Sequence, residues 1–81
     1  MAKPRRDPSE PDPQLARFGK DLRSARRQAG LSQDALADLS RISQGEISVL
    51  EAGKREPRIL TVVYLARALS IEPADLVRRL R

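Results

Sequence analysis

The side chains with the most specific binding chemistry lie between Ser43 and Ala52, where the spacing of apolar residues predicts one short helix. At 100° per residue, Glu46, Ile47 and Leu50 share one side of this helix and are expected to pack inward. The opposite side is small or uncharged and consists of Gln44, Gly45, Ser48, Val49 and Ala52. Exposed helix positions normally collect long charged side chains, so a partner other than water is expected to cover this side.

This uncharged side has the chemistry needed to read base pairs in duplex DNA. An α-helix fits the major groove, where an amide can pair with adenine and an apolar group can contact the thymine methyl. Gln44 supplies the amide and Val49 the apolar contact, while Gly45 and Ser48 would let the helix approach closely. The sequence therefore predicts base contacts from these four residues.

Catalytic chemistry is not expected. The chain has no cysteine and no histidine, which excludes thiol nucleophiles, imidazole bases, disulfides and the usual zinc ligands. Carboxylates are present at Glu46, Glu51 and Asp75, but helix capping, ion pairing and helix dipoles account for them. We therefore expect a protein that is not an enzyme and has no cofactor and no metal.

Five short helices and no strand are expected to position this surface, which makes the fold all-α. Apolar residues recur at intervals of three and four from Leu15 onward and never alternate strictly. Ser32 and Ser43 are good N-caps, and Gly30 suits a helix end. Pro73 suits the first position of the last helix. The expected helices span residues 15–29, 32–39, 43–52, 59–69 and 73–81.

Two of these helices, 32–39 and 43–52, are joined by about four residues, which is the spacing of a helix-turn-helix. Ser43 and Glu46 have the spacing of a capping box at the start of the second. The helix at 59–69 has an inward apolar stripe whose members are Ile59, Val62, Leu65, Ala66 and Leu69. The helix-turn-helix is therefore expected to rest on a small apolar core.

The 81 residues carry 16 Lys and Arg against 11 Asp and Glu, which gives a net charge of +5. Residues 1–14 are rich in proline and have balanced charges, so we expect a disordered tail there. The excess positive charge belongs to the expected domain, residues 15–81, and suits a polyanionic partner. The chain has no apolar run of membrane-spanning length and no secretory signal, so we expect a soluble, cytoplasmic protein without a membrane partner.

A second apolar patch is expected beside the inward stripe. Leu60, Val63 and Tyr64 lie outside the stripe of their helix, and Val77 lies outside the stripe of the last helix. Surplus apolar surface of this kind marks a partner site or extra core. One interpretation is a homodimer contact, since a helix-turn-helix dimer places two recognition helices about one DNA turn apart. The other is a C-terminal helix that folds back onto Leu60 and Tyr64 within one subunit.

The chain resembles the Cro/C1-type (XRE-like) helix-turn-helix family of phage repressors and bacterial transcriptional regulators. The resemblance covers residues 18–76 and implies a five-helix, lambda-repressor-like domain with the third helix in the major groove and the second across the DNA backbone. The residues that carry it are Leu31-Ser32-Gln33, Leu36-Ala37, Ile42-Ser43-Gln44, Ile47-Ser48, Leu50-Glu51-Ala52-Gly53-Lys54, Pro57 and Leu65-Ala66-Arg67-Ala68-Leu69.

The resemblance also implies roles for individual residues. Gln33 matches a glutamine that contacts a phosphate and can brace the residue present here as Gln44. Arg26 and Glu51 match an ion pair that ties the first helix to the end of the third. The family's basic phosphate contacts in the loop after the third helix match Lys54, Arg55 and Arg58.

Two kinds of departure from the family pattern have physical consequences. Arg41 and Ser70 stand where the family often has glycine, so a left-handed backbone there would carry strain. Gly45 and Val49 leave few hydrogen-bond donors on the uncharged side of the third helix. Specificity is therefore also expected to depend on DNA shape and deformability.

Together these features predict a sequence-specific, double-stranded DNA-binding transcriptional regulator, most simply a dimeric repressor. Its control would come from its own concentration, its degradation or a second, regulatory protein. Two alternatives stay open. The first is an antitoxin or a restriction-modification controller of the same fold, which a neighbouring toxin or nuclease gene would indicate. The second is a protein-interaction adaptor that does not bind DNA, which a binding assay on duplexes would exclude.

Overall fold

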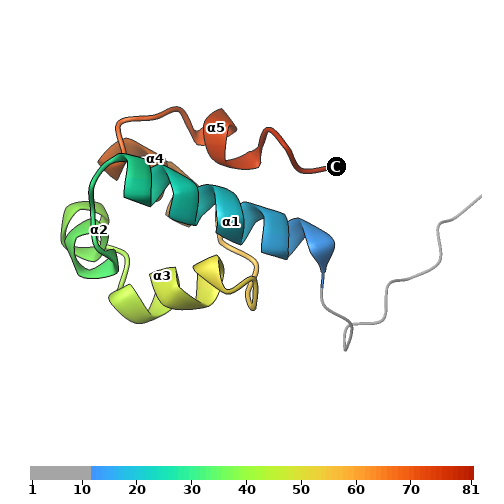
Figure 1. Cartoon of the computed structure of the whole chain (residues 1–81), viewed down its shortest axis with the longest axis horizontal. Coiled ribbons are helices and arrows are strands. Elements are labelled where there is room, and N and C mark those ends of the chain that lie inside the picture. The colour runs from blue at the N-terminus through green and yellow to red at the C-terminus, as the bar shows by residue number, and fades with distance from the viewer. Residues whose placement is uncertain (1–11) are drawn as a thin grey trace, which may run out of the picture.

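A computed structural model describes residues 12–81 as five helices around one core (Figure 1). The helices are α1 (Pro13–Gln28), α2 (Gln33–Ser40), α3 (Gln44–Glu51), α4 (Ile59–Ala68) and α5 (Pro73–Val77). Within the described range there is no strand, which agrees with the expected all-α fold. In Figure 1, α1 runs through the middle of the molecule, with α3 on one side and α5 on the other. No helix of residues 12–81 combines the length and apolar character that crossing a bilayer requires.

The first helix begins two residues earlier than expected. Asp12 is its N-cap and accepts a hydrogen bond from Gln14 N at 2.9 Å, while Pro13 fills the first turn, where a backbone N–H has no intrahelical partner. The expected tail of residues 1–14 therefore extends too far, because the Asp-Pro pair starts a helix that proline content alone does not indicate. The expectation of disorder for residues 1–11 lies outside the described residues.

Serine side chains begin α2 and α3, as predicted. Ser32 Oγ accepts a hydrogen bond from Ala35 N at 3.0 Å. Ser43 Oγ accepts one from Glu46 N at 3.1 Å, which is its half of the predicted capping box. The Glu46 carboxylate pairs instead with Arg55, so the predicted role of Glu46 is only partly correct.

The last helix is shorter than expected, since α5 ends at Val77. Pro73 occupies its first turn as predicted, and Glu72 and Asp75 form a reciprocal capping box. Beyond the helix, Leu80 N donates to Val77 O at 3.0 Å and closes one further turn. Helical spacing of apolar residues continues to Leu80, but the chain leaves the helix after Val77 and its last residues contact α1.

Those contacts tie the C-terminal residues to α1. Arg79 Nη1 donates to Asp21 Oδ1 at 3.1 Å, and Arg81 N donates to Gln14 Oε1 at 2.8 Å. The amide nitrogen of Gln14 also donates to the carbonyl oxygen of Arg81. Residues 14 and 81 therefore meet in space.

The core contains apolar side chains from all five helices. Four members of the stripe predicted on α4 are buried, but Ile59 is 77% exposed. Ile59 is the first residue of α4, so its side chain stands at the helix end and lines a groove rather than filling the core. The buried apolar residues are Phe18, Leu22, Leu36, Ile47, Leu50, Val62, Leu65, Ala66, Leu69 and Leu76.

Helices α1 and α3 approach each other closely at Gly19. A Cβ atom at this position would lie 2.6 Å from the carbonyl oxygens of Leu50 and Glu51, which is closer than real contacts allow. Glycine therefore permits the end of α3 to pack on the backbone of α1. This approach brings Glu51 to the side of α1 that carries Arg26.

The two residues that stand where the family often has glycine adopt the left-handed backbone conformation. Arg41, in the turn between α2 and α3, has a φ of 65°, and Ser70 has a φ of 59°. The turn is held by Arg41 N, which donates to Ala37 O at 2.9 Å, and by Ser40 Oγ, which accepts from Ile42 N at 3.1 Å. These bonds offset the strain of a left-handed non-glycine residue and fix the relative placement of α2 and α3.

Candidate nucleic-acid interface

The third helix has one buried and one accessible side. Ile47 and Leu50 are fully buried, as their spacing predicts. Glu46 is half-buried at the edge of that side. Val49, on the side predicted to contact bases, is also half-buried, so only part of it can reach a partner. The other residues predicted to contact bases are exposed: Gln44, Gly45 and Ser48.

The accessible side is bare near the start of α3. A Cβ atom at Gly45 would meet no other atom within 4 Å. Figure 1 shows α3 at the lower edge of the molecule, with α1 above it. A flat or grooved partner can therefore approach α3 closely from this side.

Gln44 is held through its amide by Gln33, the first residue of α2. Gln44 Nε2 donates to Gln33 Oε1 at 2.7 Å, and Gln33 Nε2 donates to Glu51 Oε1 at 3.1 Å. A hydrogen-bonded chain of three side chains therefore runs from the exposed start of α3 to its buried end. The contact between Gln33 and Gln44 that the family resemblance implies is present in the structure.

Glu51, at the buried end of this chain, is paired with Arg26 of α1. Arg26 Nε donates to Glu51 Oε2 at 2.6 Å, and Nη2 donates to Oε1 at 2.9 Å. The side chains are only 10% and 4% exposed, respectively. Arg26 Nη1 also donates to Leu31 O at 2.9 Å, so the guanidinium links α1, the loop that follows it and α3. The planar guanidinium matches the carboxylate in two places and fixes its orientation.

The surroundings of Glu51 keep its carboxylate charged. Burial opposes the charge, but hydrogen bonds from Arg26 and Gln33 and the attraction of Arg26 and Arg23 outweigh burial and lower the pKa of Glu51. Arg23 Nε lies 3.8 Å from Glu51 Oε1. Hydrogen bonding to Glu51, opposed by burial, raises the pKa of Arg26. Glu51 is therefore a hydrogen-bond acceptor, and only an acceptor, near neutral pH.

The loop between α3 and α4 carries the residues predicted to contact phosphates. Lys54, Arg55 and Arg58 are all exposed. Arg55 pairs with Glu46, which compensates part of its charge and holds the loop against α3. Helical periodicity cannot reveal this pair, because its two members lie on different elements.

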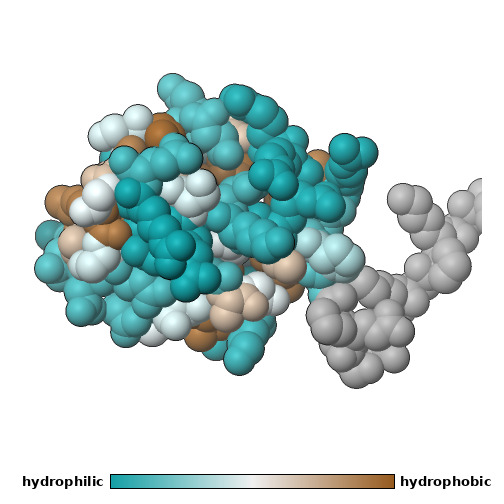
Figure 2. Space-filling view, in the orientation of Figure 1, coloured by the Kyte–Doolittle hydropathy of each residue, from teal (hydrophilic) through white to brown (hydrophobic). Residues whose placement is uncertain are grey.

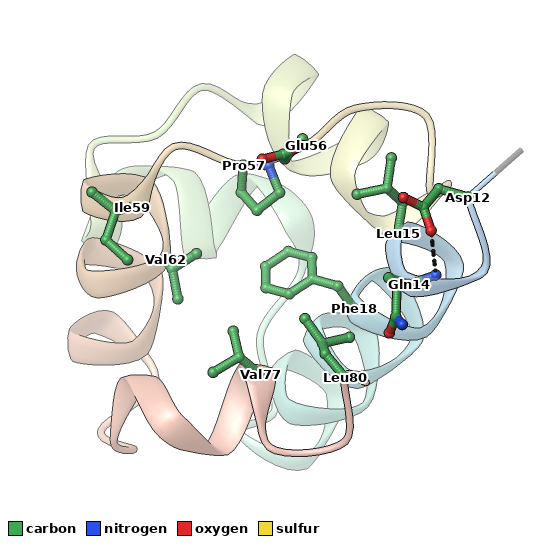
Figure 3. Close-up of a pocket in the computed structure, with 10 residues that line it drawn as sticks. All are labelled: Asp12, Gln14, Leu15, Phe18, Glu56, Pro57, Ile59, Val62, Val77 and Leu80. Atoms are coloured by element: carbon green, nitrogen blue, oxygen red, sulfur yellow. Dashed lines mark hydrogen bonds between the residues drawn. The ribbon is translucent and has the colours of Figure 1, made fainter. Parts of the chain in front are cut away.

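The residues predicted as a dimer contact fall in two places. On α4, Leu60 and Tyr64 are 55% and 41% exposed, and Val63 is half-buried. The alternative in which the C-terminal helix covers Leu60 and Tyr64 is therefore wrong. Val77 is 39% exposed and lines a groove of about 380 Å³ between α1, α4 and α5, together with Ile59 (Figure 3).

Apolar surface is not spread evenly over the molecule. Lys20, Arg23 and Arg27 of α1 are exposed. The face seen in Figure 2 is mainly hydrophilic, with apolar areas toward its margins. Among the exposed large apolar side chains of residues 12–81, Leu60 and Tyr64 lie on α4 and Leu39 lies on α2, and a partner would explain such surface.

Known proteins share the elements that build this surface. The family model described as Helix-turn-helix (HTH_3) matches residues 22–76, which include α2, the turn and α3. An uncharacterized HTH-type transcriptional regulator of Sinorhizobium fredii, y4dJ, is 37% identical over 59 residues. That match covers 73% of this chain and 77% of the relative.

Two solved structures are similar over most of their length. The restriction-modification controller protein C.AhdI from Aeromonas hydrophila is 40% identical with a TM-score of 0.75, covering 76% of this chain and 94% of that one. The clp gene regulator ClgR from C. glutamicum is 30% identical with a TM-score of 0.78, and the match covers 86% of this chain and 90% of that one. The similarity therefore extends to both the sequence and the arrangement of the helices.

Proposed function

Since this chain belongs to the helix-turn-helix family of DNA-binding transcriptional regulators, which are not enzymes, we propose that it recognises a specific double-stranded operator with α3. Its simplest mode of action is that of a dimeric repressor, which occupies promoter DNA in the cytoplasm. The observation that carries this proposal is the uncharged, accessible side of α3, with the Gln44 amide at its exposed start. Such a side suits the major groove, where base edges are read by amides and small apolar groups.

Base recognition would come from the start and middle of α3. Gln44 has the donor and acceptor that adenine requires, and the bare backbone at Gly45 allows close approach. Ser48 and Val49 lie one turn further along the same side, where a hydroxyl and a methyl group can contact neighbouring base pairs. Because these contacts are few, the deformability of the operator would contribute to specificity.

Phosphate contacts would flank the base contacts. Lys54, Arg55 and Arg58 are exposed in the loop after α3, and cations there would orient the protein on the duplex without reading sequence. Gln33 begins α2 and has an N–H that could face a phosphate while the residue still braces Gln44. The net positive charge of the chain supports attraction to a polyanion.

A dimer would be built on α4. Leu60 and Tyr64 are exposed on this helix and Val63 is half-buried beside them, while exposed Ile59 and Val77 lie in the separate groove between α1, α4 and α5. Two copies related by a two-fold axis could bury these residues against each other. Their recognition helices would then reach half-sites about 34 Å apart, one turn of DNA.

A restriction-modification controller is the second candidate function. It is favoured by the match to C.AhdI, which is described as such a controller, is 40% identical and is covered over 94% of its length. Both candidates predict an operator, and they differ in the genes that the operator controls. A nuclease or methyltransferase gene beside the coding sequence would favour the second.

Selection from a pool of randomised duplexes tests the proposed function. The protein should recover one consensus, with the two-fold symmetry of a dimer, and its affinity should fall with salt by a slope of about −0.9 per phosphate contacted. Equal binding of all sequences would contradict sequence-specific recognition. Failure to bind any duplex at low salt would contradict DNA binding and favour the adaptor alternative.

A further inference from the structure

We infer that Glu51 determines which base Gln44 reads, because it fixes the orientation of two glutamine amides in succession. This role rests on the proposed function, since it concerns a base contact of Gln44. The Glu51 side chain is 4% exposed, so it acts as a positioning residue through its neighbours. The chain of contacts runs from Glu51 to Gln33 at 3.1 Å and from Gln33 to Gln44 at 2.7 Å.

The chemistry of these groups and the geometry of their contacts together specify one arrangement. An ionised carboxylate has acceptors and no donor, so the group of Gln33 that faces Glu51 must be its NH₂. The structure places the other end of this amide, the Gln33 oxygen, toward Gln44, and because this oxygen can only accept, Gln44 must present its own NH₂ to Gln33. The orientation of both amides therefore follows from the charge on Glu51.

Neighbouring residues of α1 keep Glu51 charged and fix its position. Arg26 donates two hydrogen bonds to it, at 2.6 and 2.9 Å, and both side chains are nearly inaccessible to solvent. The close contact at Gly19 holds the end of α3, including the Glu51 backbone, on α1. A fixed anion of this kind acts in the free protein, so no reorganisation is needed when DNA binds.

The consequence for DNA is a preference between the two purines. With one N–H given to Gln33, Gln44 keeps one N–H and its oxygen for the base edge. Adenine offers a donor at N6 and an acceptor at N7, which this pair complements. Guanine offers two acceptors, N7 and O6, which would require both N–H groups of Gln44. In the reverse orientation, with its oxygen toward Gln33, Gln44 would have both N–H groups free and could accept guanine.

The test compares base preferences selected from the randomised duplex pool. The base pair read by Gln44 is the one whose preference is lost in Gln44→Ala, and it should be adenine in the wild-type protein. In Glu51→Gln, whose amide no longer dictates the orientation of Gln33, the adenine-to-guanine ratio at that position should fall by about five-fold or more. Preferences at the other positions should be unchanged.

Gln33→Met provides an independent variant, because it breaks the chain while Arg26 and Glu51 remain paired. It should lower the same ratio, and the double variant with Glu51→Gln should lower it no further, since both act on one pathway. A merely structural role of Glu51 would lower the affinity for all sequences and leave this ratio unchanged. If Glu51→Gln does not fold, as circular dichroism would reveal, the double variant Arg26→Met/Glu51→Gln, which removes both buried charges together, replaces it in the test.

Arg23→Gln is the matched control. It removes a cation 3.8 Å from Glu51 but leaves both amide contacts intact, so the consensus should not change. The inference is overturned if a folded Glu51 variant retains the wild-type ratio, or if the position read by Gln44 is not adenine. Absence of any consensus with the wild-type protein would instead overturn the proposed function, so the two failures can be distinguished.

Discussion

The two sides of α3 differ in how much change each can tolerate. On the inner side, Leu50 is completely buried, and a Cβ atom at Gly19 of α1 would overlap the backbone of α3. On the outer side, a Cβ atom at Gly45 would meet nothing within 4 Å. The inner side is thus constrained by packing within the chain, whereas most of the outer side is open to a partner. Substitutions should therefore separate stability from recognition within one helix of eight residues.

The largest effect is expected from Arg26→Met. The substitution leaves Glu51 buried without its main cationic partner, so the free energy of unfolding should fall by about 3–5 kcal/mol. Urea denaturation followed by circular dichroism measures this loss. Arg23→Gln, which removes an exposed cation near the same carboxylate, should cost about 0.5 kcal/mol or less. Equal losses in the two variants would contradict the distinction between buried and exposed contacts.

Gly19→Ala and Gly45→Ala compare the two sides of α3 directly. The first places a methyl group 2.6 Å from two backbone oxygens and should lower the free energy of unfolding by about 3 kcal/mol as α1 and α3 move apart. The second enters open space and should raise it by up to about 1 kcal/mol, because alanine favours the helix. Thermal unfolding of both variants provides the measurement. A stable Gly19→Ala protein would show that α1 and α3 can separate at little cost.

Gln44→Ala should change recognition and leave stability almost untouched. Its side chain is exposed, so the free energy of unfolding should stay within about 0.5 kcal/mol of wild type. Discrimination at one base pair should fall by about 1–3 kcal/mol, the contribution of one bidentate contact. Competition between duplexes that differ at single positions measures this loss. An unchanged preference at every position would remove Gln44 from the recognition surface.

A weaker and less selective effect is expected from Arg58→Ala. Loss of one phosphate contact should lower the affinity for all sequences alike and reduce the salt slope by about 0.9. Binding isotherms at several salt concentrations, with the selected and a scrambled duplex, provide the test. Glu56→Gln, an exposed change in the same loop, is the control and should preserve or slightly increase affinity. A change in consensus with Arg58→Ala would assign it a base contact instead.

The smallest effect is expected on the stability of the protein at low pH. The pKa of Glu51 lies below its ordinary value of 4.5, so its ionised form stabilises the folded state. This contribution is complete above about pH 4.5 and is lost as pH falls through the lower pKa of the folded protein. When urea denaturation is repeated below pH 4.5, the free energy of unfolding should therefore fall more in the wild-type protein than in Glu51→Gln. Equal losses in the two proteins would show that other carboxylates cause most of the loss of stability at low pH.

Much of the fold could be predicted because its signals are local. Serine at positions 32 and 43 begins helices through bonds to residues three positions away, and Arg41 turns the chain within one residue. Ile59 could not be placed by periodicity, because a stripe does not reveal where the core ends along the helix axis. The close contact at Gly19 had one available signal, a glycine inside a helical pattern, but its neighbour lies on another helix.

The candidate site shows the same limit. The accessible side of α3 follows from angular spacing alone, and Gln44 lies on it as expected. The bond between Gln33 and Glu51 joins residues 18 positions apart, so it depends on how α2 packs against α3. The pairing of Arg55 with Glu46 likewise requires the path of the loop. Patterns thus identify which side chains are available, and tertiary packing decides what holds them.

The contact of Gln14 with the backbone of Arg81 has a practical consequence for engineering. Because these residues touch, a short peptide could join Arg81 to the nearby Asp12, which keeps the N-cap of α1 in place. The domain is therefore suited to circular permutation, with new ends opened in a surface loop such as the one between α4 and α5. A permuted chain would preserve every helix while changing the order in which they are synthesised.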